Sequence, residues 1–489
     1  MPSRRALSGA VFFVVISAFL TPFQRGLFVG DETKYGEVVR EMRIGGSFFL
    51  PTLGGVPFTH KPPVHFWLID LLTYALGLYS TWAFVLPSLA AFVFLLYLTW
   101  RMGGPLAAFM TGASLLIWGS AQSARMDVGF TAFIVLAVWM MRRVFDENDS
   151  RALGIAGVSL AIATLIKGPM APVIGIVLFL LEAWRRRSFP RTRYVPALAA
   201  IVVIPLLWFV PAMMLGGGAY THEVIVKQTV GRAFGSWVHQ APAWFYLLHM
   251  PAILFPWFLL ALAALRGANR FYLSWIIAVL VPYSLMSSKL DVYMMALIPP
   301  VALMIAEFVK RGDKWTQPLN LAMLVLITVL GVVALLALPR FPEANLPRVK
   351  TMFVILSIAA LIGLIVSMAR RDLSTLVVGI VPIVAFVYAA VALMPLANDV
   401  ATPQPLIAAL LKQNVPPEQM ALYTCPHLWS RNFPRQLERV RYVDAGTLGQ
   451  PALIATSRAH ANEIASTLSN YRKVDEVRMI GKWFDVYRR

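Results

Sequence analysis

Residues 319–338 read "LNLAMLVLITVLGVVALLAL" and contain no charged side chain. An α-helix rises about 1.5 Å per residue, so a run of this length crosses a bilayer core of about 30 Å. Similar apolar runs recur along the chain, and only 14% of its residues are charged. Soluble domains carry about a quarter. Because backbone groups in lipid must be satisfied within a segment, the sequence predicts an all-α polytopic membrane protein.

The net charge of +19 over 489 residues would suggest a nucleic-acid partner in a soluble protein. Here the cations lie mostly between apolar runs, so membrane topology explains most of them and we expect no nucleic acid. The single cysteine, Cys425, excludes an internal disulfide. The basic start "MPSRR" with its long apolar continuation has no clear cleavage site, which favours an uncleaved first span.

About 13 transmembrane helices are expected from hydropathy. They lie near residues 7–27, 82–100, 104–121, 126–143, 152–166, 168–184, 196–215, 241–262, 271–287, 291–309, 317–338, 351–369 and 373–396. Segment 62–80 is a rival span, but Asp70 and its double proline favour a helix lying at the interface.

The distribution of Lys and Arg among the loops indicates how these spans are oriented in the membrane. With a cytoplasmic N-terminus, the basic clusters of the short loops fall on the cytoplasmic side. Arg340, Arg348 and Lys350 are exceptions. Loops 28–81 and 216–240 are then periplasmic. We therefore predict a transmembrane domain over 1–397 in the bacterial inner membrane, followed by a periplasmic domain over 398–489.

The tail after 397 reads as a small α/β domain. Strand-like stretches occur at 421–425, 441–445, 452–456 and 483–489, and a helical pattern covers 459–472. It shows no catalytic-looking cluster, so a scaffold or lid is its simplest interpretation.

The segment "GDETKYGEVVREM" (30–42) is predicted to form an amphipathic surface helix, because Tyr35, Val38, Val39 and Met42 share one face. Asp31 precedes its first turn, where a carboxylate caps free N–H groups. Capping alone would not require the neighbouring Glu32 and Lys34, so we also consider Asp31 a reactive carboxylate.

Loop 28–81 supplies two further polar residues, His60 and Lys61. Others stand at the outer ends of the predicted spans, where ionisable groups are by default functional candidates. They are Arg125, Asp127, Lys167, Lys289, Asp291 and Tyr293. Each alone could be a helix-end anchor. Together, the cations suit a phosphate and the carboxylates suit proton abstraction. These requirements match glycosyl transfer from a lipid-phosphate sugar.

These motifs resemble the membrane glycosyltransferases of GT-C architecture, near the bacterial 4-amino-4-deoxy-L-arabinose transferases of lipid A and the protein O-mannosyltransferases. "DETKYGEVVREM" is similar to the first-loop motif with the catalytic Asp, here Asp31. "HKPPVHFWL" matches the segment whose lysine, here Lys61, lies at the donor phosphate. "ARMD", "LIKGP" and "SKLDVYMMALIPPVAL" resemble the family's later motifs at Asp127, Lys167, and Lys289 with Tyr293.

The long-loop motif gives the most specific resemblance. Its series in this chain is Glu223, Gln228, Arg232, His239, Pro242, Tyr246, Pro256 and Trp257. The resemblance implies that these polar residues, with Glu32, Lys34, Tyr35 and Arg125, bind substrate. His60 stands where the family often has a Glu suspected of contacting zinc, so a divalent metal, held by His60, stays open; no other cofactor is expected.

The sequence thus predicts a glycosyltransferase that moves a sugar from an undecaprenyl-phosphate-linked donor to a periplasm-facing acceptor, lipid A or another envelope glycolipid. Protein O-mannosylation is the alternative within the class. A transporter or flippase of lipid-linked glycans is the alternative outside it. Transporters place their site near the bilayer midplane, whereas these polar residues gather at one edge.

Overall fold

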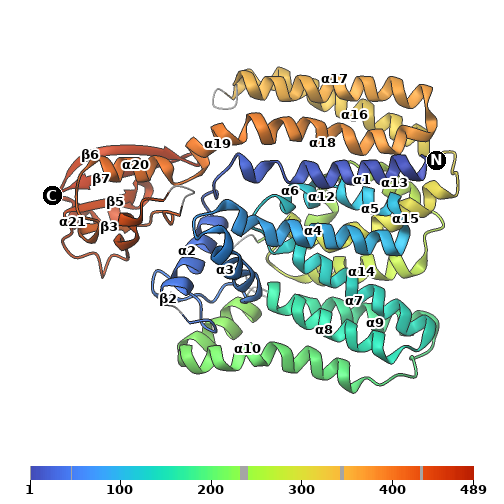
Figure 1. Cartoon of the computed structure of the whole chain (residues 1–489), viewed down its shortest axis with the longest axis horizontal. Helices are drawn as coiled ribbons and strands as arrows, with labels where there is room; N and C mark the ends of the chain where they lie inside the picture. The colour runs from blue at the N-terminus through green and yellow to red at the C-terminus, as the bar shows by residue number, and fades with distance from the viewer. Residues whose placement is uncertain (1, 46, 232–239, 342–345, 430–432) are drawn as a thin grey trace. The chain divides into compact units, whose positions relative to one another are not determined.

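The computed structural model describes residues 2–45, 47–231, 240–341, 346–429 and 433–489. The chain divides into two compact units. The first holds residues 1–20, 59–65 and 86–390, and the second holds 21–58, 66–85 and 391–489. Figure 1 labels the helices and strands of both.

The first unit is a bundle of helices (Figure 1). Its members are α1 (Arg4–Ala18), most of α4 (Thr81–Gly103), α5 (Pro105–Gly112), α6 (Leu115–Ala121), α7 (Asp127–Glu147), α8 (Ser150–Lys167), α9 (Met170–Arg186), α10 (Val195–His222), α12 (Phe245–Ile253), α13 (Phe258–Ala264), α14 (Arg270–Leu285), α15 (Ile298–Lys310), α16 (Thr316–Ala337), α17 (Pro347–Ala369) and α18 (Ser374–Ala392).

Nine helical segments in the described residues are long and apolar enough to cross a membrane. They are Arg4–Phe23, Thr81–Gly103, Asp127–Glu147, Ser150–Lys167, Val195–Gln228, Asp291–Lys310, Thr316–Arg340, Pro347–Ala369 and Arg371–Ala392. Each matches one of the predicted spans, so the polytopic all-α membrane class is confirmed. The total of about 13 stays a prediction.

The other four predicted spans are also helical but shorter or broken. α9 and α14 have 17 and 16 residues. Segment 104–121 is broken between α5 and α6, and segment 241–262 bends by 112° between α12 and α13. Two of these four predicted segments are therefore not single continuous helices. Backbone groups at the two breaks pair with each other, because the Leu115 N–H donates to the Phe255 carbonyl at 3.3 Å. Trp257 Nε1 donates to the Met110 carbonyl at 2.8 Å. Freed backbone groups inside a bilayer need such partners.

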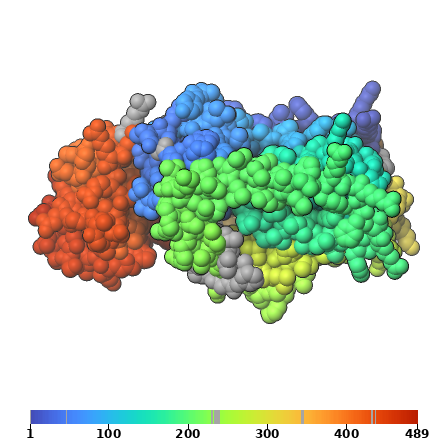
Figure 2. Space-filling model, turned by 90° about the horizontal axis from the view of Figure 1, so that it is seen from below, coloured from blue at the N-terminus to red at the C-terminus, as the bar shows by residue number. Residues whose placement is uncertain are grey.

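The described first part of the predicted loop 216–240 is helical. α10 continues to His222 and a π-helical segment covers Glu223–Gly231. Only Gly217, with φ 69° and ψ −168°, interrupts the helical path. Figure 2 shows α10, in green, along the surface of its unit, and side chains such as Leu207 and Met214 are exposed on it. These apolar residues suit contact with lipid tails.

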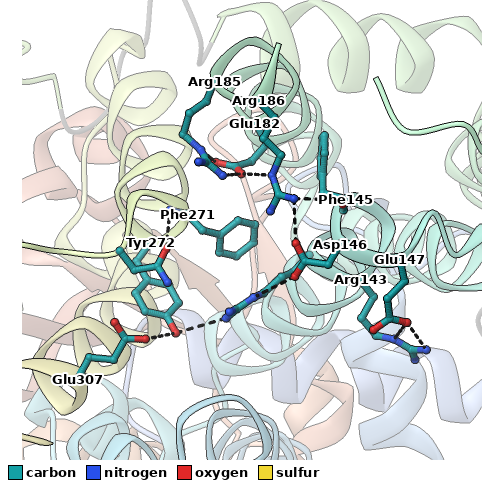
Figure 3. A network of polar contacts seen from close by, with 12 residues as sticks. Arg143, Phe145, Asp146, Glu147, Glu182, Arg185, Arg186, Phe271, Tyr272 and Glu307 are labelled. Atoms are coloured by element: carbon teal, nitrogen blue, oxygen red, sulfur yellow. Dashed lines mark hydrogen bonds and ion pairs between the residues drawn. The ribbon is translucent and has the colours of Figure 1, made fainter. Parts of the chain in front are cut away.

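A network of charged residues holds four helices together at the carboxyl end of α7 (Figure 3). Glu182 of α9 is fully buried and accepts from Arg186 at 3.2 Å, and Arg186 pairs with Asp146 of α7 at 2.8 Å. Tyr272 of α14 donates to Glu307 of α15 at 3.1 Å. A buried carboxylate needs such partners to stay charged.

The second unit contains the predicted surface helix as α2 (Asp31–Ile44), the hairpin β1 (Thr52–Leu53) and β2 (Val56–Pro57), and most of α3 (Val64–Leu76). Tyr35, Val38 and Val39 are buried along α2, as its apolar face predicts. With 13 residues, α3 is too short for a bilayer crossing and agrees with an interfacial helix rather than a span.

The same unit ends in the predicted small α/β domain. α19 (Met394–Ala401) and α20 (Gln404–Lys412) precede β3 (Met420–Tyr423), β4 (Arg441–Val443), β5 (Leu453–Ser457), α21 (Ala465–Leu468), β6 (Arg472–Met479) and β7 (Lys482–Arg488). The sheet has the order β4-β3-β5-β7-β6. β3 runs parallel to β4 and β5, and β7 runs antiparallel to β5 and β6.

The tail differs from the sequence expectation at two places. The helix expected over 459–472 is a 3₁₀ turn, Arg458–Ile464, followed by the four-residue α21. β6 was not predicted, because its sequence "RKVDEVRM" is mostly polar. It lies at the edge of the sheet, where charged side chains oppose pairing of the free edge with another chain.

Candidate active site

An ion pair joins the ends of two antiparallel helices of the first unit. Asp127 is the first residue of α7 and Lys167 is the last residue of α8. Lys167 Nζ lies 2.5 Å from Asp127 Oδ1, and each side chain is only 9% exposed. The ammonium also lies 4.6 Å from the centre of the Tyr293 ring, a favourable cation–π contact. Three predicted site residues are therefore in direct contact.

Two more predicted cations act on this pair. Lys61 and Arg125 both exert electrostatic attraction on the Asp127 carboxylate. The neighbouring His65 is 4% exposed, and its burial, reinforced by the Lys61 charge, lowers its pKa to about 4. With His65 neutral, Lys61, Arg125 and Lys167 each direct a positive charge at the Asp127 carboxylate. Such a surplus of positive charge suits a phosphate.

Sequence reasoning missed three residues that build this region. Besides His65, Ser88 fixes the Arg125 backbone, because its Oγ accepts from the Arg125 N–H at 3.1 Å and donates to the Arg125 carbonyl at 2.8 Å. His249 Nδ1 lies 2.8 Å from Asp291 Oδ1. The partners are 37 and 42 residues apart, so no local pattern marks them.

Lys289 takes a different position from the other predicted cations. Its side chain is buried, and Nζ donates to the Met286 carbonyl just beyond the end of α14. Burial lowers the pKa of this ammonium. Tyr293 stacks on Tyr283 with ring centres 5.3 Å apart. Lys289 thus satisfies a helix-end carbonyl, and its role toward substrate stays a prediction.

The π-helical segment carries two more predicted residues. Glu223 pairs with Lys227 at 2.8 Å and accepts from Gln228 Nε2 at 3.3 Å. His60 also interacts electrostatically with the Glu223 carboxylate. Two predicted site residues, Arg232 and His239, lie outside the described residues.

The predicted catalytic residue belongs to the second unit. Asp31 is the first residue of α2, whereas Gly30 occupies the N-cap position and no side-chain cap bond forms. The N-cap interpretation of Asp31 was therefore wrong. Its carboxylate is exposed, and within the described ranges it has no hydrogen-bond or ion-pair partner. It is available to a substrate.

The neighbours of Asp31 are built into the fold. Glu32 is buried, forms an ion pair with Arg25 and accepts from the Phe28 N–H at 2.9 Å. Tyr35 is 4% exposed and meets the Phe66 ring edge-on at 5.3 Å. Glu32 and Tyr35 therefore stabilise the fold, a role that was not predicted from the sequence. Lys34 is half-buried.

The side chains that could bind a divalent metal ion are spread over the described residues. No three His, Cys, Asp or Glu side chains in the described part of the chain come together as a metal-binding group. His60 is exposed, and a lone histidine does not define a metal site. The described residues therefore do not fit a bound metal.

Solved structures share this fold. The chain resembles the crystal structure of ArnT from Cupriavidus metallidurans bound to undecaprenyl phosphate, with a TM-score of 0.80 over 99% of this chain and 98% of that one, at 18% identity. The apo form of the same protein matches with a TM-score of 0.75. The protein is thus a multi-pass membrane protein with the GT-C fold.

Curated relatives in sequence include bacterial aminoarabinose transferases. An undecaprenyl phosphate-alpha-4-amino-4-deoxy-L-arabinose arabinosyl transferase of Pseudomonas fluorescens is 29% identical over 68% of this chain. The match spans only 63% of that relative's length. A protein of the same name from Sodalis glossinidius is 26% identical over 90% of this chain and 82% of its own.

One family signature also matches. Residues 60–211 fit the family described as dolichyl-phosphate-mannose-protein mannosyltransferase. This range contains Lys61, His65, Arg125, Asp127 and Lys167. The chain is therefore a GT-C-type protein that resembles the bacterial aminoarabinose transferases, as its sequence motifs indicate.

Proposed function

We propose that this protein is an inner-membrane glycosyltransferase. It moves a pentosyl or hexosyl group from an undecaprenyl-phosphate-linked donor to a periplasm-facing acceptor, lipid A or another envelope glycolipid. The observation that carries the proposal is the ion pair of Lys167 with Asp127, whose carboxylate is also attracted by Lys61 and Arg125. The names and substrates of the relatives support the choice of donor.

The chemistry assigns a role to each group. The Asp31 carboxylate accepts the proton of the acceptor hydroxyl, whose oxygen forms a bond to the anomeric carbon of the sugar. The bond from that carbon to the phosphate oxygen breaks, and the electron pair leaves with undecaprenyl phosphate. Lys61, Arg125 and Lys167 stabilise the negative charge that grows on the departing phosphate. Asp127 holds the Lys167 ammonium in place.

Donor binding tests the phosphate site. Lys61→Ala removes one charged partner, which is worth about 1.5–3 kcal/mol for a hydrogen bond to a charged group. We expect the Kd for undecaprenyl phosphate to rise about 10–100-fold. Arg101→Ala is the matched control, because Arg101 is an exposed cation in the last turn of α4, where it bonds to Tyr97. Equal Kd values for both variants would place the phosphate elsewhere.

The acceptor has a second candidate. The family signature over residues 60–211 names protein mannosyltransferases, which favours a protein hydroxyl as the alternative acceptor. Mass spectrometry of envelope lipids and of envelope proteins from a deletion strain separates the two. Loss of a sugar from a lipid supports the proposal, and loss from proteins only supports the alternative.

Orientation follows from the charge bias. We infer that the N-terminus is cytoplasmic and that residues 398–489 form a domain on the periplasmic side, because Arg and Lys of the short loops then face the cytoplasm. An alkaline phosphatase fused after Arg489 should be active, and a cytosolic fluorescent reporter at that position should be dark. The opposite pattern would mean that one helix is miscounted.

A further inference from the structure

α2 contains a glycine where a side chain would not fit. Gly36 lies in the middle of the helix, a position where glycine is less favourable than alanine. A Cβ atom built on Gly36 would lie 2.4 Å from both Cγ and Cδ1 of Trp429, and 2.9 Å from its Cβ. The missing side chain leaves a notch in the helix surface, and the indole ring fills it.

Trp429 is also held from its other side. The residue is 2% exposed and meets the Phe84 ring edge-on at 4.8 Å. Tyr79 lies beside the indole at 6.2 Å and beside Phe433 at 5.3 Å. All these residues belong to the second unit. The indole therefore has little freedom to move away from Gly36, since protein interiors are close-packed.

A second contact fixes the approach to α2. The Val29 N–H donates to the Ala401 carbonyl at 2.7 Å, and the Gly26 N–H donates to Asn398 Oδ1 at 2.9 Å. Residues after 390 thus hold the chain before α2 as well as the middle of the helix. Asp31 lies between these two contacts, five residues before Gly36, which is about 7.5 Å along a helix.

We propose that the contact of Trp429 with the Gly36 notch is a positioning device. The C-terminal domain fixes the rotation of α2 and thereby the place of the Asp31 carboxylate. Trp429 and Gly36 are positioning residues and do not touch the substrate. This inference rests on the catalytic role proposed for Asp31. It gives the C-terminal domain a positioning function toward α2.

A size exchange tests the contact. Gly36→Ala adds a methyl group where the indole lies, so α2 must shift. A misplacement of about 1 Å can lower turnover roughly 10²-fold, and we expect kcat to fall about 10–100-fold with little change in the KM for the donor. Trp429→Leu in the Gly36→Ala background makes room for the added methyl group. It should raise kcat at least several-fold above that of Gly36→Ala alone. Gly45→Ala is the control in the same segment, because nothing lies within 4 Å of its Cβ position.

Hydrogen exchange of the α2 amides in the purified full-length protein supplies a readout that does not depend on activity. Gly36→Ala should speed exchange, and the double variant should slow it again. Additive effects without rescue in both readouts would overturn the inference. Rescue of exchange without rescue of kcat would overturn the positioning role. Absence of transfer by the wild type would contradict the proposed function instead, since exchange reports the contact by itself.

Discussion

At the scale of the residue, Asp31 is the exposed carboxylate on which the proposed chemistry depends. Because it forms no cap bond and no ion pair within the described residues, Asp31→Asn removes charge without removing a structural contact. We expect the protein to fold normally and turnover to drop about 10²–10⁴-fold, the usual contribution of a general base. Turnover with purified donor and the melting temperature measure both effects.

Glu32→Gln is the matched contrast to this variant. It breaks the buried pair with Arg25, and loss of one partner of such a pair costs roughly 3–5 kcal/mol. We expect this variant to melt at a lower temperature. Near-normal turnover of Asp31→Asn would remove the base role.

Candidate site residues could be predicted from the sequence, whereas most of the side chains that they contact could not. Charges at helix ends mark Asp127 and Lys167, because an ionisable group near lipid needs a reason to be there. The contacts of Ser88 with the Arg125 backbone and of His249 with Asp291 join residues 37 and 42 positions apart, and these segments meet only in the folded protein. No local pattern in the sequence marks such contacts.

At the scale of the element, Gly217 is the position where the path of α10 turns. Its φ of 69° with ψ of −168° is a backbone region that only glycine adopts readily, at a strain of about 1–3 kcal/mol for other residues. Gly217→Ala should straighten or destabilise the junction to the π-helical segment, which we expect to close over the donor.

Protease accessibility of this segment measures the effect. In the wild type, undecaprenyl phosphate should protect it, and Gly217→Ala should abolish the protection. Gly218→Ala is the matched control, since its backbone is not in the left-handed region and nothing lies within 4 Å of a Cβ there. Equal protection in both variants would show that no hinge acts at Gly217.

Elements were predicted where composition alone decides them. The nine long apolar helices follow from length and hydropathy. The breaks in 104–121 and 241–262 do not, because the hydrogen bond from Leu115 to Phe255 that accompanies them joins segments 140 residues apart in number. An apolar run looks the same in sequence whether it crosses straight or bends.

At the scale of the whole molecule, the fold tolerates wide change of sequence. The solved relative shares the architecture over 99% of this chain at only 18% identity. Membrane helices need apolar length rather than particular residues, so the architecture persists while individual side chains vary. The functional prediction from sequence therefore depended on short motifs, such as those around Lys61 and Lys167, and not on the apolar spans.

Sugar transfer by the purified protein in detergent tests the central claim most directly. The assay supplies a labelled undecaprenyl-phosphate sugar and a lipid A acceptor, with no membrane and no ion gradient. We expect labelled acceptor and released undecaprenyl phosphate from the wild type, and neither above background from Asp31→Asn. Absence of transfer in detergent, together with movement of the intact lipid-linked sugar across the bilayer of vesicles containing the protein, would contradict the account and identify a flippase.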